Sequence, residues 1–196
     1  MKASTLTIAL LIICAPAFAG DAPAPDPKAM QEAMQKMGTI GAEHAAMAKD
    51  IGEWETQETM WMAPGAPPMT SKGSSTIAST LDGKWFRQDY RGEMMGQPFT
   101  GLGLNGYDTL QKKYVSVWTD SFSTGLCTMT GTSEDGGKTV SYTGRLEHCP
   151  MTGGPLDMRS IITHESADRF TMTMFHAPEG QPEVKAMEMI YTRKKK

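Results

Sequence analysis

Positive charge, valine and cysteine are scarce in this sequence of 196 residues, and each scarcity narrows the range of possible functions. The chain carries 19 lysines and arginines against 22 aspartates and glutamates, for a formal net charge of −3. No basic stripe runs along any segment, although nucleic-acid binding depends on such a stripe to release counterions. We therefore expect no nucleic-acid partner. The basic ending, residues 194–196 after Arg193, is interpreted as a solvated tail.

Long apolar runs are absent after the first nineteen residues, so we expect no membrane span, which requires about 20 apolar residues. The early run Leu6–Cys14 follows Lys2 and precedes Ala17-Phe18-Ala19, which is the pattern of a cleaved secretory signal. The sequence therefore predicts a signal peptide over residues 1–19 and a periplasmic or secreted protein. A flexible leader rich in alanine, proline and aspartate is expected over residues 20–27.

Two cysteines, Cys127 and Cys149, remain once the signal is removed. In an oxidising compartment two cysteines usually form a disulfide. They lie near the start of one predicted strand and just past the end of the next, which would place both at the same end of the fold. We expect a structural disulfide, with two free thiols or a metal site as the alternatives.

Signatures of catalysis and of cofactor binding are missing as well. The sequence contains neither a G-x-S-x-G nucleophile elbow nor an H-E-x-x-H metal motif. The stretch Gly101-Leu102-Gly103 is not a phosphate-binding loop, because no strand-to-helix transition follows it. We assign no catalytic residue, no cofactor and no metal ligand.

What the sequence does contain begins with a well-marked helix start. Asp26 can cap a helix whose first residue is Pro27, a position at which the missing N–H of proline has no cost. Three methionines at helical spacing then form one apolar stripe. We predict a helical segment over residues 28–50, with a second short helix over residues 43–49.

From residue 51 the hydrophobic period changes to two, and glycine-rich turns separate the segments. Ten strands are predicted: Glu53–Met62, Met69–Thr80, Trp85–Arg91, Gln97–Asn105, Lys113–Asp120, Gly125–Thr132, Thr139–Glu147, Leu156–His164, Arg169–Ala177 and Val184–Arg193. No connection is long enough for a crossover helix, which favours antiparallel neighbours. Because closure removes exposed edges, we predict a mainly β fold over residues 51–193, an antiparallel up-and-down closed barrel of about ten strands.

Methionine is the compositional excess, with 17 in the chain against only four valines. Met172 and Met174, like Met187 and Met189, are two residues apart, so each pair lies on one face of a strand. We interpret the thioethers as filling the interior or lining an adaptable apolar pocket. The alternative is a copper(I) site, because soft thioether ligands select that ion.

Barrels of this strand number can hold a small ligand. We therefore expect the interior to bind a small hydrophobic or amphipathic molecule. The expected lining is Trp118, Asp120, Tyr142, Phe170, Met172, Met174, Met187 and Met189. An enzymatic alternative would use Asp120 with Tyr107 or His164. In a further interpretation, side chains fill the interior completely and the outer surface contacts a partner.

A closed barrel also makes its first and last strands neighbours, which would bring Trp54 close to Arg193. A guanidinium over the indole would seal one end of the barrel through a cation–π contact of about 0.5–2 kcal/mol. The alternative is an ordinary strand tryptophan with a solvated arginine.

A series of short motifs is similar to an exported bacterial family known only as a domain of unknown function. The motifs are Gly52-x-Trp54, Gly83-x-x-Phe86, Tyr90-x-Gly92, Pro98-Phe99-x-Gly101, Gly106-Tyr107-Asp108, Trp118-x-Asp120-Ser121-x-x-Thr124, Pro150-x-Thr152-Gly153 and Lys185-x-Met187-Glu188-x-x-Tyr191-x-Arg193. The Gly-x-Trp start also resembles the calycin superfamily, which includes lipocalins and nitrobindin-like haem barrels. The resemblance covers residues 45–194 and implies a calycin-like barrel without assigned catalytic residues. By analogy with the haem barrels, a haem protein would need an inward-facing histidine, for which His176 is the candidate.

Overall fold

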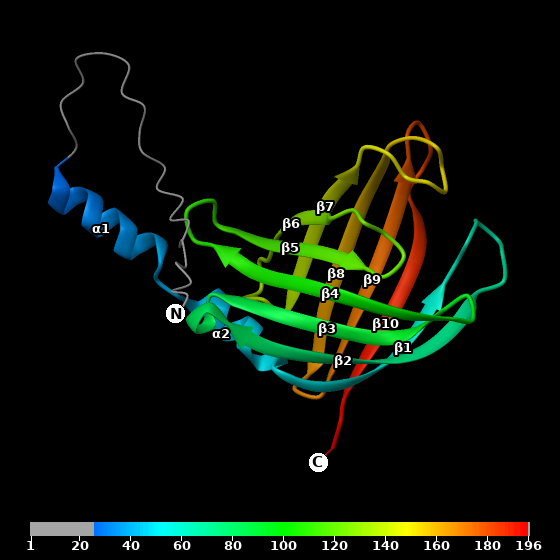
Figure 1. The fold of residues 1–196 in the computed structure, drawn as a ribbon, viewed down its shortest axis with the longest axis horizontal. Coiled ribbons are helices and arrows are strands. Elements are labelled where there is room, and N and C mark those ends of the chain that lie inside the picture. The colour runs from blue at the N-terminus through cyan, green and yellow to red at the C-terminus, as the bar shows by residue number, and fades with distance from the viewer. Residues whose placement is uncertain (1–25, 196) are drawn as a thin grey trace, which may run out of the picture. The chain divides into compact units, whose positions relative to one another are not determined.

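The computed structural model describes residues 26–195, so the predicted signal peptide and most of the predicted leader lie outside the described residues. Within that range the chain forms two α-helices, two short 3-10 helices and ten strands (Figure 1). The helical elements are α1 (Pro27–Met37), α2 (Ala42–Met47), η1 (Ala48–Asp50) and η2 (Leu81–Gly83). The strands are β1 (Gly52–Met60), β2 (Met69–Thr80), β3 (Trp85–Met94), β4 (Gln97–Asp108), β5 (Lys113–Asp120), β6 (Cys127–Thr132), β7 (Thr139–Leu146), β8 (Leu156–Ser166), β9 (Arg169–Pro178) and β10 (Val184–Arg193).

The first helix begins where the sequence predicts. Asp26 caps it, because its carboxylate accepts the Lys28 N–H at 3.0 Å and its carbonyl accepts the Met30 N–H at 3.0 Å. Within the described range the chain divides into two units at residue 37, so that α1 belongs almost entirely to the first unit and the barrel to the second. None of the helices in residues 26–195 is long and apolar enough to cross a membrane.

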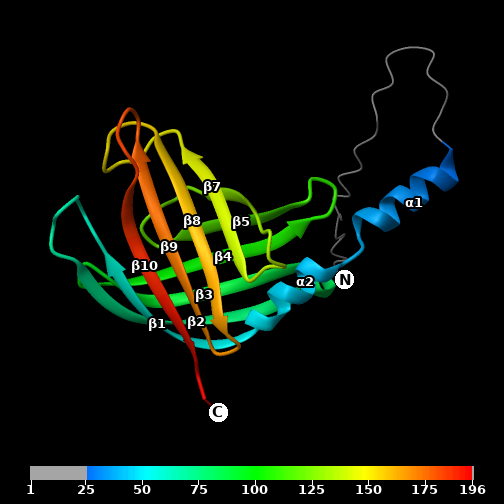
Figure 2. The ribbon, with the colours of Figure 1, turned by 180° about the vertical axis from the view of Figure 1, so that it is seen from behind.

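The strands form a closed antiparallel barrel in which each strand pairs with the next along the chain (Figure 2). The last pairing joins β1 to β10, with Trp54 opposite Arg193 and Met60 opposite Met187. Every strand therefore has a hydrogen-bonded neighbour on both sides, and no sheet edge is left open. The predicted fold class is confirmed.

The predicted strands are all present, and the largest changes in their bounds are in β3 and β4, each of which is three residues longer than predicted. β4 extends to Asp108, at the turn into β5, and β3 extends to Met94, at the hairpin between β3 and β4. The hairpin closes at Met95 and Gly96, which have φ values of 52° and 75°. Two successive residues at positive φ give a turn whose twist matches the strands, so pairing continues up to the turn itself.

The core of the barrel is more aromatic than the methionine count suggests. One cluster of buried residues surrounds Trp54 and Phe170, and a second surrounds Tyr114 and Tyr142. Met47, from α2, packs against both. Aromatic rings thus supply much of the buried surface, and several methionines are left partly exposed to the interior.

The structure does not show the predicted disulfide, because Cys127 and Cys149 are both free thiols, which is one of the alternatives expected from the sequence. Met129 pairs with Gly144, so Cys127 comes level with residue 146, three positions short of Cys149. A tight turn also holds Cys149, whose N–H donates to Gly154 and whose carbonyl accepts from Gly153, both at 2.8 Å. Cys149 belongs to the core cluster around Tyr114 and Tyr142, and Cys127 packs against the same cluster.

Candidate functional site

The interior of the barrel holds a cavity of about 410 Å³. All ten strands contribute side chains to its wall, and Ala46, Met47 and Asp50 from α2 and η1 cover one end. The volume lies within the range typical of sites for small molecules. The interior is therefore not completely filled by side chains, contrary to one interpretation of the sequence.

All eight side chains that the sequence places in a pocket lie on the wall of this cavity: Trp118, Asp120, Tyr142, Phe170, Met172, Met174, Met187 and Met189. The four methionines come from two neighbouring strands in matched register. Met172 lies opposite Met189, and Met174 lies opposite Met187. They form one thioether surface, and their role in binding stays a prediction.

Trp118 lies across the backbone of the neighbouring strand. A Cβ atom added to Gly101 would lie 2.1 Å from the indole ring, so glycine is required for this close approach. The indole N–H donates to one oxygen of Asp120 at 3.1 Å, and the other oxygen accepts the Phe122 N–H at 3.0 Å. Asp120 therefore orients Trp118 and starts the β5–β6 loop.

Three buried polar groups were not predicted from the sequence. Glu58 is only 5% exposed, Thr56 is 4% exposed and Tyr90 is 2% exposed. The Thr56 and Tyr90 hydroxyls have no partner at good hydrogen-bond geometry, although they lie close enough to interact electrostatically with each other. Burial raises the pKa of the Glu58 carboxyl, and the nearby Tyr90 hydroxyl lowers it in part.

Next to this group lies a polar cluster whose members do have partners. The Gln88 side-chain amide donates to the Ser75 hydroxyl and to the Tyr191 hydroxyl, each at 3.1 Å. Tyr191 in turn stacks on Phe170 with ring centroids 4.2 Å apart. We call Thr56, Glu58 and Tyr90 the polar wall, and of these Glu58 and Tyr90 line the cavity.

The charged residues of the cavity are unbalanced. Asp50, Glu58 and Asp120 lie on its wall together with His164 and His176, and none of the described lining residues is a lysine or arginine. His176 does face inward, and burial lowers its pKa. Among residues 26–195, no three side chains of histidine, cysteine, aspartate and glutamate come together in a way that could hold a metal ion.

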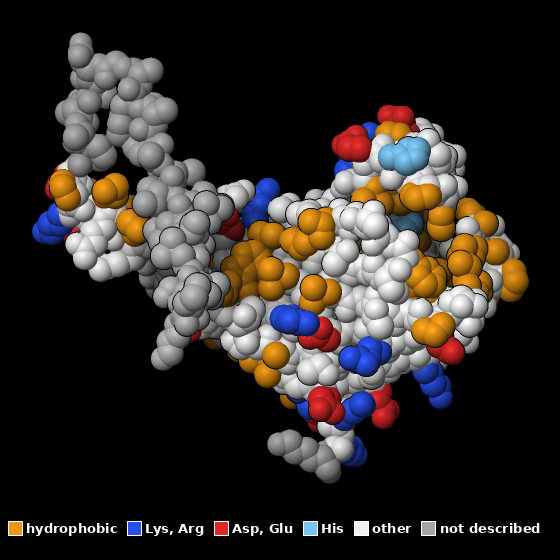
Figure 3. All heavy atoms as spheres, viewed as in Figure 1, with side chains coloured by type: hydrophobic (Ala, Val, Ile, Leu, Met, Phe, Trp, Pro, Cys, Tyr) orange, Lys and Arg blue, Asp and Glu red, His pale blue; other side chains and the backbone are white. Residues whose placement is uncertain are grey.

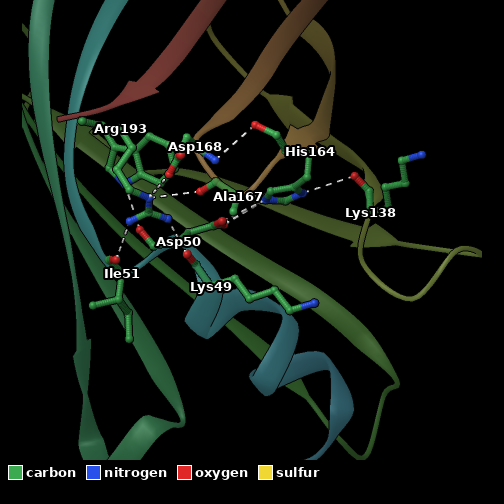
Figure 4. A network of polar contacts seen from close by, with 10 residues as sticks. Lys49, Asp50, Ile51, Lys138, His164, Ala167, Asp168 and Arg193 are labelled. Atoms are coloured by element: carbon green, nitrogen blue, oxygen red, sulfur yellow. Dashed lines mark hydrogen bonds and ion pairs between the residues drawn. The ribbon is translucent and has the colours of Figure 1, made fainter. Parts of the chain in front are cut away.

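The end of the barrel covered by α2 is held by Arg193 (Figure 4). Its guanidinium donates to three backbone carbonyls, those of Lys49 at 2.7 Å, Ile51 at 2.9 Å and Ala167 at 3.0 Å. It also lies 4.1 Å from the ring centroid of Trp54, which confirms the predicted cation–π contact. We call this end, with its residues Asp50, Trp54, His164 and Arg193, the closed end.

An ion pair reinforces the closed end. Nε2 of His164 lies 3.0 Å from both carboxylate oxygens of Asp50, and Nδ1 lies 3.2 Å from the Lys138 carbonyl oxygen (Figure 4). The hydrogen bond to Asp50 raises the pKa of His164. Asp50 also accepts the indole N–H of Trp54 at its backbone carbonyl, 2.8 Å away, so one residue joins the helical segment to two strands.

The opposite end carries large exposed apolar side chains on its loops, and we call it the mouth. These side chains are Met62, Met69, Met95, Phe122, Leu126 and Met151. In the space-filling view, hydrophobic side chains gather around a hollow on this part of the surface (Figure 3). The Phe122 ring packs edge-on against Phe99, which lines the cavity, with centroids 5.4 Å apart.

The structure does not bring together the residues of the enzymatic alternative. Asp120 lies at the mouth, whereas Tyr107 pairs with Tyr114 at the far end of β5, roughly 20 Å away at the rise of a strand. His164 lies at the closed end with Asp50. Both carboxylate oxygens of Asp120 already accept hydrogen bonds, so nothing in this geometry prepares it as a base.

The polar wall could have been found from the sequence by counting alternation in β1. Trp54, Thr56 and Glu58 share one face of that strand and are all buried, while Glu53, Glu55 and Gln57 point outward. Glu58 is four residues after Trp54, so it lies on the same face of the strand as this predicted core residue, and this spacing indicated a buried glutamate. Tyr90 could not be found in this way, because only the register of β1, β2 and β3 brings it to Glu58.

The sequence over residues 39–193 matches the family model described as Protein of unknown function (DUF1579). The structure is similar to that of Rv2717c from M. tuberculosis, with a TM-score of 0.56 and 14% identity over 80% of this chain and 100% of that one. It is also similar to the S-type phycobiliprotein lyase CPES from Guillardia theta, with a TM-score of 0.55 and 13% identity over 83% of this chain and 97% of that one. No curated protein matches the sequence. At these identities the structural likeness shows a shared barrel fold and nothing about activity.

Proposed function

Because the chain belongs to the DUF1579 family, whose description names no activity, we propose a function from the cavity itself: it binds a small apolar or amphipathic molecule. The supporting observation is the cavity of about 410 Å³, which has a wall built from aromatic and thioether side chains and a few polar groups. Sites for small molecules typically combine such an apolar wall with a small number of polar groups that fix orientation. Methionine suits an adaptable wall, because its side chain is flexible and polarizable.

The test is native mass spectrometry of the protein purified from its own host, compared with two variants. We expect a retained small molecule in the wild type and its loss in Met174→Trp, because the indole would fill the cavity. The matched control is Met151→Trp, at an exposed position of the β7–β8 loop, which should keep the molecule. A bare polypeptide mass, together with no binding of apolar probes to the purified protein, would contradict the proposal. The same spectrum and the colour of the sample would reveal a bound haem.

A soft metal ion is a second candidate, because Met172, Met174, Met187 and Met189 are paired across two strands on the cavity wall. Thioethers are ligands that select copper(I). The test is a copper(I) titration under reducing conditions, in which Met174→Leu with Met187→Leu should abolish binding. Substituting two methionines of α1 with leucine is the matched control. Equal copper affinity in all three proteins would remove this candidate.

We also propose that the protein acts after export from the cytoplasm, in the periplasm or outside the cell. The support is the pattern of the first nineteen residues, with Lys2 before an apolar run and Ala17-Phe18-Ala19 at its end. N-terminal sequencing of protein from its host should begin at Gly20. An intact Met1 on protein recovered from the cytoplasm would contradict the proposal.

A further inference from the structure

The chemical class of the ligand can be argued from the three acidic side chains on the cavity wall. Asp50 is paired with His164, whose Nε2 lies 3.0 Å from both of its oxygens. Asp120 accepts one N–H on each oxygen, from Trp118 and from Phe122. Two of the three acids therefore already have partners that satisfy their charge.

Glu58 differs from both. Its neighbours across the strand pairs are Met189 and Ser71, neither of which carries a charge. The Tyr90 hydroxyl is the polar group that interacts with its carboxyl, and no described residue gives Glu58 an N–H donor or an ion pair. Glu58 is thus a carboxyl group that is 5% exposed, faces the cavity and has no counter-charge.

A carboxyl in this position is costly to the empty protein. Removing a carboxylate from water without a cation or hydrogen-bond donors is unfavourable, and a buried hydroxyl without a partner adds to that cost. A ligand that carries its own cation would compensate both, since N⁺–H···O⁻ hydrogen bonds are about twice as strong as neutral ones. The site therefore has the electrostatic form of a receptor for a cation.

The aromatic rings near Glu58 also favour a ligand with a positive charge. The Tyr90 ring centroid lies 5.9 Å from that of Phe99 and 6.4 Å from that of Trp118, so three rings gather on this side of the cavity. Ring faces attract cations. Conversely, an anionic ligand such as a fatty acid would meet acidic groups and no lysine or arginine among the described lining residues.

We propose that the cavity selects cationic amphiphiles: the protonated amine of the ligand meets the Glu58 carboxyl, next to which the Tyr90 hydroxyl lies buried, and its apolar part lies on the methionine and aromatic wall. This inference rests on the proposed function, since it names the class of molecule that the same cavity takes. Glu58 determines specificity, because it favours an amine over a neutral or acidic head group on the same apolar chain.

The test uses three probes with one chain, octylamine, octanol and octanoate, each titrated against the purified protein by calorimetry below its aggregation concentration. The wild type should bind octylamine at least tenfold more tightly than octanol, and octanoate most weakly. In Glu58→Gln the affinity for octylamine should fall to that for octanol, and the affinity for octanol should stay within twofold. The matched control, Glu55→Gln, makes the same charge change on the outward face of β1 and should alter no affinity.

The outcomes distinguish the amine selectivity from the proposed binding of apolar molecules on which it rests. Equal affinities for octylamine and octanol in the wild type, or an octylamine affinity unchanged in Glu58→Gln, would overturn the amine selectivity while the cavity still binds apolar molecules. Tightest binding of octanoate would overturn it as well. No binding of any of the three probes would contradict the proposed function itself, and the amine selectivity with it.

Discussion

The closed end and the polar wall are both buried, yet the polar groups of the closed end have partners and those of the polar wall lack them. At the closed end, Arg193 donates to three carbonyls and His164 pairs with Asp50 (Figure 4). On the polar wall, the Thr56 and Tyr90 hydroxyls lack partners and Glu58 lacks a counter-charge. Buried polar groups in native proteins are normally satisfied, so an exception calls for an explanation.

The difference indicates which region stabilises the fold and which is available for binding. At the closed end the polar groups have partners: the Trp54 indole N–H donates to the Asp50 carbonyl, and the Arg193 guanidinium lies over the indole ring. These contacts hold the helical segment on the barrel. Unsatisfied groups on a cavity wall reduce stability, and proteins retain such groups where function needs them. Four predictions test this contrast, and they follow in order of expected size.

The largest effect is expected from breaking the closed end at Trp54. Trp54→Ala removes a nearly fully buried ring, its edge contact with Phe170 at 4.7 Å and its hydrogen bond to Asp50. We expect the free energy of unfolding to fall by about 3–5 kcal/mol, measured by urea denaturation. Trp61→Ala, near the mouth, is the control and should cost less than half as much. Equal losses at the two positions would contradict the contrast.

A smaller loss is expected when Arg193 keeps its charge but loses its geometry. In Arg193→Lys, an ammonium group cannot reach three carbonyls and the Trp54 ring together, so the unfolding free energy should fall by about 2 kcal/mol. The exposed pair of Arg87 and Asp89 offers a control, since Arg87→Lys should leave the free energy of unfolding almost unchanged. A tolerated Arg193→Lys would mean that charge alone holds the closed end.

Removing the Glu58 carboxyl from the polar wall should raise the free energy of unfolding, whereas the changes at the closed end lower it. Burial raises the pKa of Glu58, so the folded state disfavours its carboxylate, and stability is lost as pH rises through that raised pKa. Glu58→Gln has no proton to lose, so it should be more stable than the wild type at pH 8 by on the order of 1 kcal/mol. At pH 4 the two proteins should be alike. Glu55→Gln is the control at both pH values, and a Glu58→Gln variant destabilised at pH 8 would make Glu58 a structural residue.

The smallest effect is expected in the pH dependence of the closed end. The pKa of His164 is raised in the fold by Asp50, so the stability from this pair is complete below the unfolded pKa and is lost as pH rises through the folded one. The unfolding free energy of the wild type should exceed that of His164→Asn by roughly 0.5 kcal/mol at pH 5, and the gap should close by pH 9. Burial lowers the pKa values of His44 and His176, but both proteins share that effect. A gap independent of pH would show that the imidazole acts by packing alone.

Alternation along single strands was enough to predict much of this molecule. Strand β7 was predicted as Thr139–Glu147 because Val140, Tyr142 and Leu146 alternate with polar residues, and it ends one residue earlier, at Leu146. The eight predicted lining residues lie on the cavity wall for the same reason, since side-chain parity follows from the pleat. The predicted disulfide is not shown, and the hydrogen-bonded turn that holds Cys149 could not be found from proximity along a hairpin.

The sequence by itself determined the period of two, the short connections and the apolar parity of each strand, because these depend on neighbours along the chain. Only the tertiary structure decided that Glu58 faces Tyr90 without a counter-charge, and that Asp50 meets His164 across 114 positions of sequence. Those contacts depend on the register of strands distant in the chain and on where the barrel closes. A strand's alternation states which face a side chain takes but leaves open what lies opposite, and the charge balance of the cavity depends on what lies opposite.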